Sequence, residues 1–283
     1  MKKFLAFTMA AAMTLSLAAC GGGSGSGSNT SADGSGSAAF KLGGTGPLTG
    51  DASIYGLAAQ RGAQIAVDEI NAEGGAIQFE LKYEDDVNDP EKAVNAYNAL
   101  KEWGMQISLG SVTTQPCIAT SSYNFADSIF ALTPSASSPD VISGKDNVYQ
   151  MCFSDPNQGT ASAKYISEQK LGEKVFIIWK SDDNYSTGIK DKFVAEAETL
   201  GLNVVGNATF TADSKNDFTV QLTQAKQAGA DLLFLPIYYD AASLILTQAN
   251  AMGYAPKFFG VDGMDGILTQ ANFDTSLAEG VML

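Results

Sequence analysis

The sequence predicts an α/β protein of two lobes, each a mostly parallel sheet with helices on its faces. Three observations lead to this prediction. Strand and helix patterns alternate throughout the chain after residue 39, which is typical of parallel sheets. The length of 283 residues fits about two domains. The segment Asp155-Pro156-Asn157-Gln158-Gly159 interrupts the alternation, so we expect the lobes to cover residues 39–154 and 155–283.

The N-terminus has the features of an export signal. Lys2 and Lys3 precede an apolar run that ends near Leu17 and is too short for a stable membrane span. We therefore expect residues 1–19 to be a signal peptide. Leu17-Ala18-Ala19-Cys20 resembles the bacterial lipobox, in which the cysteine is lipidated and becomes the mature N-terminus. The alternative is an ordinary signal peptide with an incidental cysteine.

Residues 20–38 predict a tether rather than a folded element. After Cys20 they consist almost entirely of Gly, Ser, Asn, Thr and Ala, a composition that is flexible and cannot form a core. No later apolar run approaches the ~20 residues that a transmembrane helix needs. We expect a soluble body that is held at a membrane only through lipidated Cys20.

The composition argues against several classes of function. Lys+Arg 17 and Asp+Glu 31 give a net charge of −14, and loss of Lys2 and Lys3 with the leader leaves 15 − 31 = −16. Such a charge repels nucleic acid and anionic lipid heads. The chain has no histidine, which excludes His-based acid–base catalysis, His-activated nucleophiles and His-ligated metals. We expect no cofactor and no metal.

Neither the cysteines nor the glycines form a nucleotide or redox motif. Cys20, Cys117 and Cys152 contain no C-x-x-C. Cys117 and Cys152 could pair in an oxidising compartment or remain buried free thiols, and their spacing does not decide between these. The glycines at 44, 46 and 50 have the wrong spacing for a dinucleotide fingerprint. Gly144-Lys145 is followed by Asp rather than by the Ser or Thr of a phosphate loop.

In the first lobe, short-range signals predict alternating elements. Residues 77–84 alternate apolar and polar side chains, which is typical of a half-buried strand. Asp89 and Pro90 predict a helix start, and Gly104 predicts its end. Asp85, Asp86 and Asp89 lack the Gly and terminal Glu of a calcium loop, so they predict a solvated turn and a helix cap. The expected strands are 40–44, 77–84, 105–110, 129–133 and 148–153, and the expected helices are 54–71, 90–103 and 116–127.

The stretch from Leu109 to Pro116 has the features of a small-anion site. Gly110 permits a tight turn, hydroxyl residues follow, and Pro116 suits the first position of a helix. A helix N-terminus offers unpaired N–H groups and a partial positive charge, so it can hold a carboxylate without Lys or Arg. Alternatively, these hydroxyls only cap the helix. A second hydroxyl-rich loop, 134–139, should lie on the same carboxyl edge, where parallel sheets bind ligands.

The loops of the second lobe carry different chemistry. Three of them are acidic and aromatic, at residues 182–185, 237–240 and 261–265. Carboxylates beside phenol rings favour a cation. Together with the anion site of the first lobe, they match a zwitterionic amino acid, although each loop alone could be a polar strand end. The expected strands are 174–179, 204–210, 231–235 and 257–260, and the expected helices are 160–170, 187–200, 218–228 and 241–252.

Several short motifs, in a fixed order, resemble the branched-chain amino-acid-binding proteins of bacterial ABC importers. The resemblance covers residues 40–283 and implies a two-lobed fold, periplasmic-binding-protein type I, that closes on its ligand. The motifs are Gly46-Pro47-Leu48-Thr49-Gly50, Asn71-x-x-Gly74-Gly75, Asp85-Asp86, Gly110 with Thr114-Gln115-Pro116, Thr133-Pro134-Ser135-Ala136, Asp155-x-x-Gln158-Gly159, Tyr185-x-x-Gly188 and Tyr238-Tyr239.

The resemblance implies five ligand-binding residues in the first lobe. Ser111 and Thr114 resemble the residues around the ligand carboxylate, although Thr114 could mainly cap the helix. Ala136 and Ser137 resemble the pair whose carbonyl and hydroxyl reach the ammonium and the carboxylate. Tyr55 falls where an aromatic ring lines the side-chain pocket.

In the second lobe the resemblance implies three further ligand-binding residues. Tyr185 and Tyr238 resemble the aromatics that close over the ligand. Asp262 stands where many amino-acid binders have a Glu that contacts the ammonium. Asp is one methylene shorter than Glu, so the charge is preserved while selectivity can differ.

The resemblance implies a monomeric lipoprotein outside the cytoplasm, which captures a branched-chain or other apolar amino acid and passes it to the permease and ATPase subunits of an importer. It also implies further residues after Leu283, so we expect a fragment. One alternative is a binder or sensor of an amide, urea or aromatic acid on the same fold. An enzyme is a more distant alternative, because only a carboxylate pair such as Asp262 and Asp265 could supply acid–base chemistry.

Overall fold

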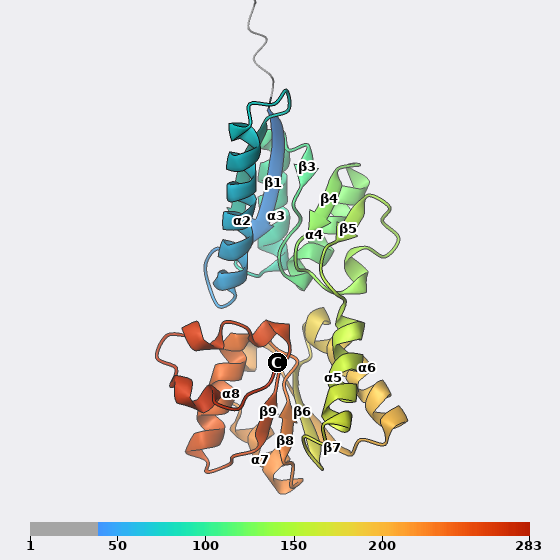
Figure 1. Ribbon diagram of the computed structural model, residues 1–283, viewed down its shortest axis with the longest axis vertical. Helices are drawn as coiled ribbons and strands as arrows, with labels where there is room; N and C mark the ends of the chain where they lie inside the picture. The colour runs from blue at the N-terminus through green and yellow to red at the C-terminus, as the bar shows by residue number, and fades with distance from the viewer. Residues whose placement is uncertain (1–38) are drawn as a thin grey trace, which may run out of the picture. The chain divides into compact units, whose positions relative to one another are not determined.

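The computed structural model of the protein describes residues 39–283 (Figure 1). Within this range it has two parallel sheets flanked by helices, as predicted. All nine predicted strands and all seven predicted helices are present in this part of the chain. The predicted signal peptide, the lipidation site Cys20 and the tether lie outside the described residues.

The first sheet has five strands in the order β2-β1-β3-β4-β5. Its register begins with Phe40 opposite Phe79 and ends with Gly46 opposite Asp85. Figure 1 shows helices α2 and α3 beside strand β1. The elements are β1 (Phe40–Gly46), α2 (Ser53–Ala72), β2 (Phe79–Asp85), α3 (Pro90–Trp103), β3 (Ile107–Ser108), α4 (Thr114–Ala126), β4 (Phe130–Thr133), the 3-10 helix η1 (Pro139–Val141) and β5 (Val148–Gln150).

The second sheet has four strands in the order β7-β6-β8-β9. Helices α5 and α6 lie next to each other beside it (Figure 1). Its elements are α5 (Asp155–Glu168), β6 (Val175–Lys180), α6 (Asn184–Leu200), β7 (Val204–Phe210), η2 (Ala212–Ser214), α7 (Thr219–Gln227), β8 (Leu232–Phe234), α8 (Tyr239–Ala251), β9 (Lys257–Phe259), η3 (Asp262–Met264), η4 (Ile267–Thr269) and η5 (Thr275–Ala278).

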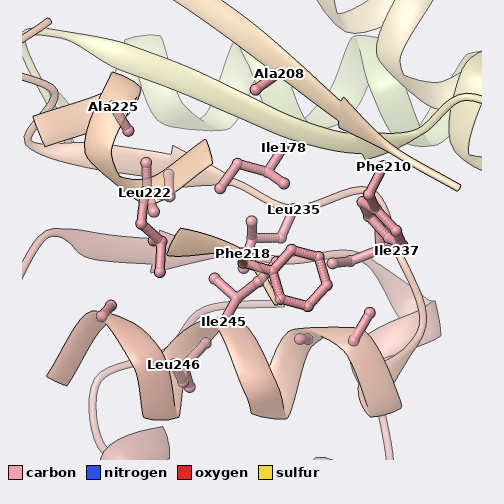
Figure 2. Close-up of a cluster of buried hydrophobic side chains, with 14 of the residues drawn as sticks. Ile178, Ala208, Phe210, Phe218, Leu222, Ala225, Leu235, Ile237, Ile245 and Leu246 are labelled. Atoms are coloured by element: carbon pink, nitrogen blue, oxygen red, sulfur yellow. The ribbon is translucent and has the colours of Figure 1, made fainter. Parts of the chain in front are cut away.

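The period-two geometry of the strands divides the core of the second sheet between its two faces. On one face, Ile178 packs in a cluster with Phe218 and Ile245 (Figure 2). On the other face, Ile177 belongs to a cluster in which the rings of Phe193 and Phe234 stack at 4.0 Å. Because both faces of this sheet are buried, its central strands β6 and β8 are apolar at almost every position.

Several helices begin earlier than the sequence predicts, and at two of them the difference involves proline. Helix α4 begins at Thr114, so Pro116 is its third residue rather than its first. Helix α5 begins at Asp155 rather than at residue 160, so the segment with Pro156 is a helix start and not a break. The first N–H groups of a helix have no intrahelical partner, so proline is tolerated throughout the first turn. Strand β5 also ends at Gln150 instead of 153.

The prediction of a solvated acidic turn after β2 is partly wrong, because Asp86 is buried. Its Oδ1 accepts a hydrogen bond from the backbone N–H of Asn88 at 2.9 Å. The neighbouring Asp85 accepts from the backbone N–H of Leu48 at 2.8 Å and from the Thr49 hydroxyl at 2.6 Å. Asp85 therefore fixes the loop between β1 and α2. The predicted cap is confirmed, since Asp89 accepts from the N–H of Lys92 at 2.8 Å.

Two further features bear on the predictions. Cys117 is buried, Cys152 is half-buried, and both are free thiols, so the disulfide alternative is not found. Among residues 39–283, no helix combines the length and the apolar character that crossing a membrane requires.

Candidate ligand-binding site

A small cavity lies where loops at the carboxyl ends of both sheets meet. Its volume is about 20 Å³, which is room for about one water molecule. Five of the eight predicted ligand-binding residues line it, namely Tyr55, Ser137, Tyr185, Tyr238 and Asp262. Its remaining lining residues, which lie in the predicted loops but were not among the predicted ligand-binding residues, are Val112, Thr113, Ser135 and Gly263.

The start of helix α4 forms one wall of this cavity. No side chain caps this helix. The Thr113 hydroxyl donates to Oδ1 of Asn88 at 2.7 Å, and the Thr114 hydroxyl accepts from the N–H of Ser137 at 3.3 Å. The N–H groups of Thr113, Thr114 and Gln115 have no backbone acceptor among the described residues. The positive end of α4 therefore remains available for an anion, which the capping alternative would not allow.

Ser111, Thr114 and Ala136 lie behind the cavity rather than on its surface. Ser111 is fully buried, and its hydroxyl is 2.5 Å from the Thr45 hydroxyl and 3.1 Å from that of Thr120. The Ala136 carbonyl accepts a hydrogen bond from the Gln150 side chain at 2.6 Å. These polar groups are already engaged inside the first lobe, so they support the loops that carry Thr113 and Ser137.

Gly110 gives the loop before α4 its tight turn, as predicted. Its φ is +64°, in the left-handed region, and a side chain there would meet Thr133 at 3.0 Å. Thr133 itself donates to the carbonyl of Ser111 at 2.7 Å. Close packing of the β3–α4 and β4–η1 loops therefore depends on a glycine at this position.

The opposite wall consists of stacked tyrosines and a carboxylate. The rings of Tyr185 and Tyr238 stack with centroids 4.8 Å apart. The Tyr185 hydroxyl donates to Oδ1 of Asp262 at 2.5 Å and accepts from the N–H of Gly263 at 2.9 Å. A Cβ at position 263 would be 2.6 Å from that hydroxyl, so glycine is needed for this contact. Asp262 is solvent-exposed, and Tyr185 fixes the orientation of its carboxylate.

Tyr55 of α2 crosses the cavity to the residues of the other wall. Its hydroxyl is 2.6 Å from the carbonyl of Gly263 and 2.8 Å from that of Asp265. A phenol has one proton to donate, so the two carbonyls share it. Burial, followed by the nearby Asp262 carboxylate, raises the pKa of Tyr55, so the phenol keeps the proton that these contacts need. Its ring also lies 6.0 Å from the Tyr238 ring.

Two buried carboxyls next to the site carry unusual pKa values. Burial raises the pKa of Asp155 to about 7, and neighbouring carboxylates, Asp262 foremost, add to the shift. Burial likewise raises the pKa of Asp183 to about 6, although Lys180 opposes this shift. No Lys or Arg lines the cavity. The site is therefore suited to a cationic group, and no cluster of three or more Asp, Glu or Cys in residues 39–283 is arranged to hold a metal ion.

Partial signals for these two carboxyls are present in the sequence. Asp155 stands in the Asp155-x-x-Gln158-Gly159 motif, but Pro156 and the polar residues around it resemble a linker. Asp183 stands in an acidic loop that, taken alone, resembles a polar strand end. Their burial depends on segments far away in the chain, which no local pattern reveals.

A second cavity, of about 200 Å³, lies on the other side of Tyr238. Its lining includes Asn88 from the loop after β2 and Lys180, Lys215 and Asp240 from loops of the second sheet. Lys215 forms an ion pair with Asp51, in the loop before α2, and its Nζ is 3.6 Å from Oδ2 of Asp240. The Lys215–Asp51 ion pair thus connects a loop next to the second sheet to a loop next to the first sheet.

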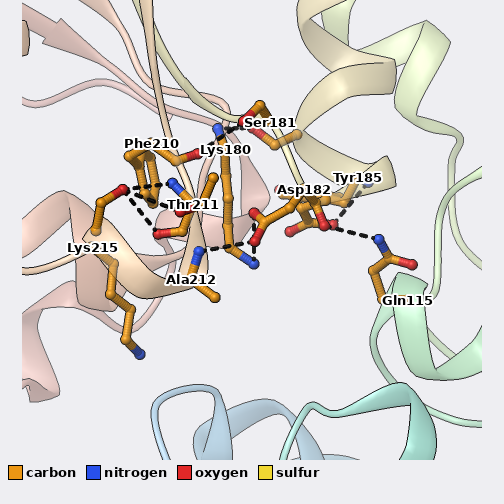
Figure 3. Close-up of polar contacts among 12 residues, drawn as sticks. Gln115, Lys180, Ser181, Asp182, Tyr185, Phe210, Thr211, Ala212 and Lys215 are labelled. Atoms are coloured by element: carbon orange, nitrogen blue, oxygen red, sulfur yellow. Dashed lines mark hydrogen bonds and ion pairs between the residues drawn. The ribbon is translucent and has the colours of Figure 1, made fainter.

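Further polar contacts connect the two halves of the described chain nearby (Figure 3). The Gln115 side chain donates to the carbonyl of Asp182 at 3.1 Å. The Asp182 carboxylate accepts from the N–H of Ala212 at 2.9 Å and lies 3.5 Å from Nζ of Lys180. Contacts with Lys180 and Ala212 thereby fix Asp182, while its carbonyl accepts the hydrogen bond from Gln115 of α4.

The fold and this site identify the protein as a member of a class of solute-binding proteins. Residues 39–280 match the family described as "Periplasmic binding protein". Because this match covers more than half of the chain, the chain belongs to that family.

Curated relatives agree with this assignment. The chain is 30% identical over 230 residues to the Leu/Ile/Val-binding protein BraC3 of Rhizobium johnstonii. The aligned region covers 80% of this chain and 62% of the relative. The chain is also 30% identical to the leucine-, isoleucine-, valine-, threonine-, and alanine-binding protein of Pseudomonas aeruginosa, over 79% of this chain and 60% of the relative. The chain thus spans about three fifths of the length of these relatives.

Solved structures confirm the predicted fold class. The leucine binding protein LivK of Thermotoga maritima has a TM-score of 0.74 at 25% identity, over 85% of this chain and 66% of that one. LivJ of Streptococcus pneumoniae, in complex with isoleucine, has a TM-score of 0.72 at 29% identity, over 78% of this chain and 64% of that one. The resemblance to branched-chain amino-acid-binding proteins is confirmed.

Proposed function

We propose that the protein is an extracytoplasmic solute-binding protein that captures a branched-chain or other apolar amino acid for an ABC importer and performs no chemistry on it. One observation carries the proposal. A single cavity joins the open N-terminus of α4 to the carboxylate of Asp262, so it offers partners to both charged groups of an amino acid. The relatives are named as binding proteins for leucine, isoleucine and valine, which supports an apolar amino acid as the ligand.

Each of the eight predicted ligand-binding residues has a role in this proposal. The ligand carboxylate accepts hydrogen bonds from the first turn of α4 and from Ser137, while Ser111, Thr114 and Ala136 hold those loops in place. The ammonium lies against Asp262, whose orientation Tyr185 fixes through its 2.5 Å hydrogen bond. Tyr55 and Tyr238 contact the apolar side chain, which gains free energy when it is removed from water.

Ligand entry requires the site to open. A cavity of about 20 Å³ is too small for an amino acid. We place the moving parts at residues 39–154 and 155–283, with the hinge before Asp155. An amino acid that touches both walls stabilises the closed arrangement through the difference in its affinity for the two states.

The family and the N-terminal sequence support a proposed location and a set of partners. Lipidation of Cys20 after removal of the signal peptide anchors the protein outside the cytoplasm, with residues 20–38 as a tether. The membrane is contacted through that anchor alone. The protein acts as a monomer and delivers its ligand to the permease, which the ATPase subunits drive.

Titration calorimetry with all natural amino acids tests the proposal. We expect saturable heat for leucine, isoleucine or valine and little for charged amino acids. Mass spectrometry of the ligand released from denatured, freshly purified protein identifies what the site holds. The absence of heat for every amino acid would contradict the proposal.

A pair of substitutions in one loop tests the ammonium site. Asp262→Asn removes the charge beside the ligand ammonium and should weaken binding roughly 10- to 100-fold, since a hydrogen bond to a charged group contributes about 1.5–3 kcal/mol. Asp265→Asn removes a charge from the same loop, where only the backbone carbonyl of Asp265 contacts Tyr55, and should leave binding within about twofold. Equal effects of the two variants in calorimetry would argue against a direct ammonium contact.

A further inference from the structure

The loop that follows β9 contains the dipeptide Asp-Gly twice, at Asp262-Gly263 and at Asp265-Gly266. Both aspartates are exposed to solvent. An aspartate before a glycine can rearrange without an enzyme, because the main-chain nitrogen of the unhindered glycine can reach the carboxyl and close a five-membered ring. Glutamate would need a six-membered ring, which closes far more slowly. This loop therefore contains two candidate sites of spontaneous modification beside the ligand cavity.

The rearrangement leaves the composition of the chain unchanged. The glycine nitrogen forms a bond to the carbon of the protonated carboxyl, and the carboxyl hydroxyl leaves as water with the proton of the N–H group. A second water molecule then opens the cyclic imide. Opening at the side-chain carbonyl restores aspartate, whereas opening at the main-chain carbonyl gives isoaspartate. The chain of isoaspartate runs through the side-chain carboxyl, so it is longer by one methylene group.

Tyr185 holds both reacting ends of the first pair. Its hydroxyl donates to Oδ1 of Asp262 at 2.5 Å and accepts from the N–H of Gly263 at 2.9 Å. Ring closure requires the Gly263 nitrogen to lose its proton and to turn toward the Asp262 carboxyl, which breaks both hydrogen bonds. Tyr185 is itself buried, and its ring stacks on that of Tyr238, so its hydroxyl cannot follow this movement. The first pair is thus protected in the folded protein.

The second pair has no such clamp. In the described part of the chain, the Asp265 carboxylate accepts no hydrogen bond and the Gly266 N–H donates none. The Asp265 carbonyl is held from the other wall of the cavity, where Tyr55 shares one proton between it and the Gly263 carbonyl. That restraint is lost whenever the site opens. Glycine is required at position 266, because its φ is +99° and a side chain there would collide with Ile54.

We propose that Asp265-Gly266 is a site of spontaneous isomerisation and that isoaspartate at this position weakens ligand binding by displacing the carbonyl that Tyr55 contacts. That carbonyl lies 2.8 Å from the Tyr55 hydroxyl. An additional methylene group in the main chain moves it relative to the Gly263 carbonyl, which lies 2.6 Å from the same hydroxyl. Tyr55 then loses part of its contact with the opposite wall, and the closed state becomes less populated. The effect on binding rests on the proposed function, whereas the isomerisation itself does not.

Peptide mapping of purified protein that has been kept for several weeks at 37 °C and neutral pH tests the modification. Mass spectrometry with electron-transfer fragmentation distinguishes isoaspartate from aspartate and assigns it to position 262 or 265. Freshly purified protein gives the starting value. We expect isoaspartate to accumulate severalfold faster at 265 than at 262. Equal rates, or a faster rate at 262, would overturn the assignment.

Two tyrosine variants separate the restraints on the two pairs. Tyr185→Phe removes the clamp and should raise isoaspartate severalfold at 262, with a much smaller change at 265. Tyr55→Phe frees the Asp265 carbonyl and should have the opposite preference. An equal increase at both positions in either variant would indicate a general loosening of the loop and would contradict the assigned restraints. If a variant does not fold, the ratio of the two positions in the wild-type protein still decides.

Calorimetric titrations of the aged protein with leucine test the effect on binding. The fraction of sites with full affinity should fall in proportion to the isoaspartate at 265. Asp265→Glu keeps the negative charge but prevents the five-membered ring, so it should retain the affinity that it has when fresh. Asp265→Asn forms the same imide more rapidly, with loss of ammonia, so its affinity should decline sooner.

Isoaspartate at 265 with undiminished affinity for leucine would overturn the effect on binding. An equal decline in aged Asp265→Glu and aged wild type would do the same, because glutamate does not form the five-membered ring. Absence of binding for every amino acid in freshly purified protein would instead overturn the proposed function, and the effect on binding with it. The peptide map would still decide the site of isomerisation.

Discussion

At the residue scale, the buried acids decide how the protein responds to pH. Asp86 has an exposed fraction of 0%, and its Oδ2 has no hydrogen-bond partner among residues 39–283. Burial raises the pKa of Asp86 to about 7, while the Asn88 N–H opposes the shift. The nearby Tyr83 hydroxyl is also buried without a partner in this part of the chain, and its pKa is raised as well. This region of the first lobe therefore contains polar groups that are costly to bury.

The contribution of Asp86 to stability falls as the pH rises. A carboxyl whose folded pKa is raised binds more protons in the folded state, so its contribution is present below the unfolded pKa, near 4, and is lost as the pH rises through about 7. We expect Asp86→Asn to flatten the decline in unfolding free energy between pH 4 and 8. At pH 8 the variant should be more stable than wild type, by at most about 4 kcal/mol for three pKa units.

Urea unfolding at several pH values measures this change. Glu80→Gln, on the exposed side of β2, is the control and should follow the wild-type profile. A parallel decline for Asp86→Asn and wild type would show that Asp86 does not titrate in this range.

At the scale of elements, helix α3 illustrates how local signals become structure. Asp89 caps its first turn, Pro90 occupies its first position, and Gly104 ends it with φ of 94°. On its inner face Ala93, Tyr97 and Leu100 are buried. Each of these features can be read from a few neighbouring residues, so both ends of this helix match the prediction.

The cap of α3 gives a prediction at this scale. Asp89→Ala removes the acceptor for the Lys92 N–H and should lower the free energy of unfolding by about 1 kcal/mol. Asp89→Ser keeps an acceptor and should lose much less. Because Asp89 does not line the ligand cavity, leucine affinity should be unchanged in both variants. A comparable loss of stability in both variants, measured by thermal unfolding, would contradict the capping role.

Helix α4 shows where the same local signals are insufficient. Its hydroxyl residues suggest caps, yet Thr113 bonds to Asn88 and Thr114 bonds to Ser137, each in a different loop. The start of the helix is thus held by tertiary contacts rather than by its own side chains. This arrangement leaves its N–H groups free for a ligand.

At the scale of the whole molecule, a few contacts connect residues of the two sheets. They are the Lys215–Asp51 ion pair, the Gln115–Asp182 hydrogen bond, the 3.1 Å bond from the Asn184 side chain to Asp140 and the contacts of Tyr55. All of them join groups of the protein itself, so they contribute to closure in addition to any ligand contact. The apparent affinity for a ligand rises with the populated fraction of the closed, binding-competent state, so contacts that favour closure also strengthen binding.

The ion pair between Lys215 and Asp51 tests this link. Lys215→Ala should weaken leucine binding by about 1.4- to 5-fold, as expected for a partly exposed pair that contributes about 0.2–1 kcal/mol. Adding Asp51→Ala should cause little further loss. The effect should shrink at high salt, because salt screens exposed charges.

Lys190→Ala provides the matched control, since Lys190 pairs with Asp191 on the same helix and not across the cavity. Calorimetry at low and high salt compares the variants. An equal loss of affinity in Lys190→Ala would indicate a general charge effect instead of a contact that favours closure.

Local sequence patterns are enough to predict the alternation of strands and helices, the ends of α3, the left-handed turn at Gly110 and most of the aromatic and acidic residues around the site. These features depend on interactions between residues close together in the chain: side-chain periodicity, capping and the conformational freedom of glycine. The resemblance to branched-chain amino-acid-binding proteins likewise depends only on short motifs and their order in the sequence.

Which polar groups are buried and which face the cavity depends on the three-dimensional packing of the chain. Asp86 and Asp155 are fully buried, and Ser111 and Ala136 are engaged inside the first lobe, although their local sequences resemble solvated turns or ligand loops. Burial and hydrogen-bond partners depend on segments far apart in the chain, such as Ser137 against Asp155 and Tyr185 against Asp262. A side chain's immediate neighbours in sequence do not specify those distant partners, and the partners set its pKa and its role.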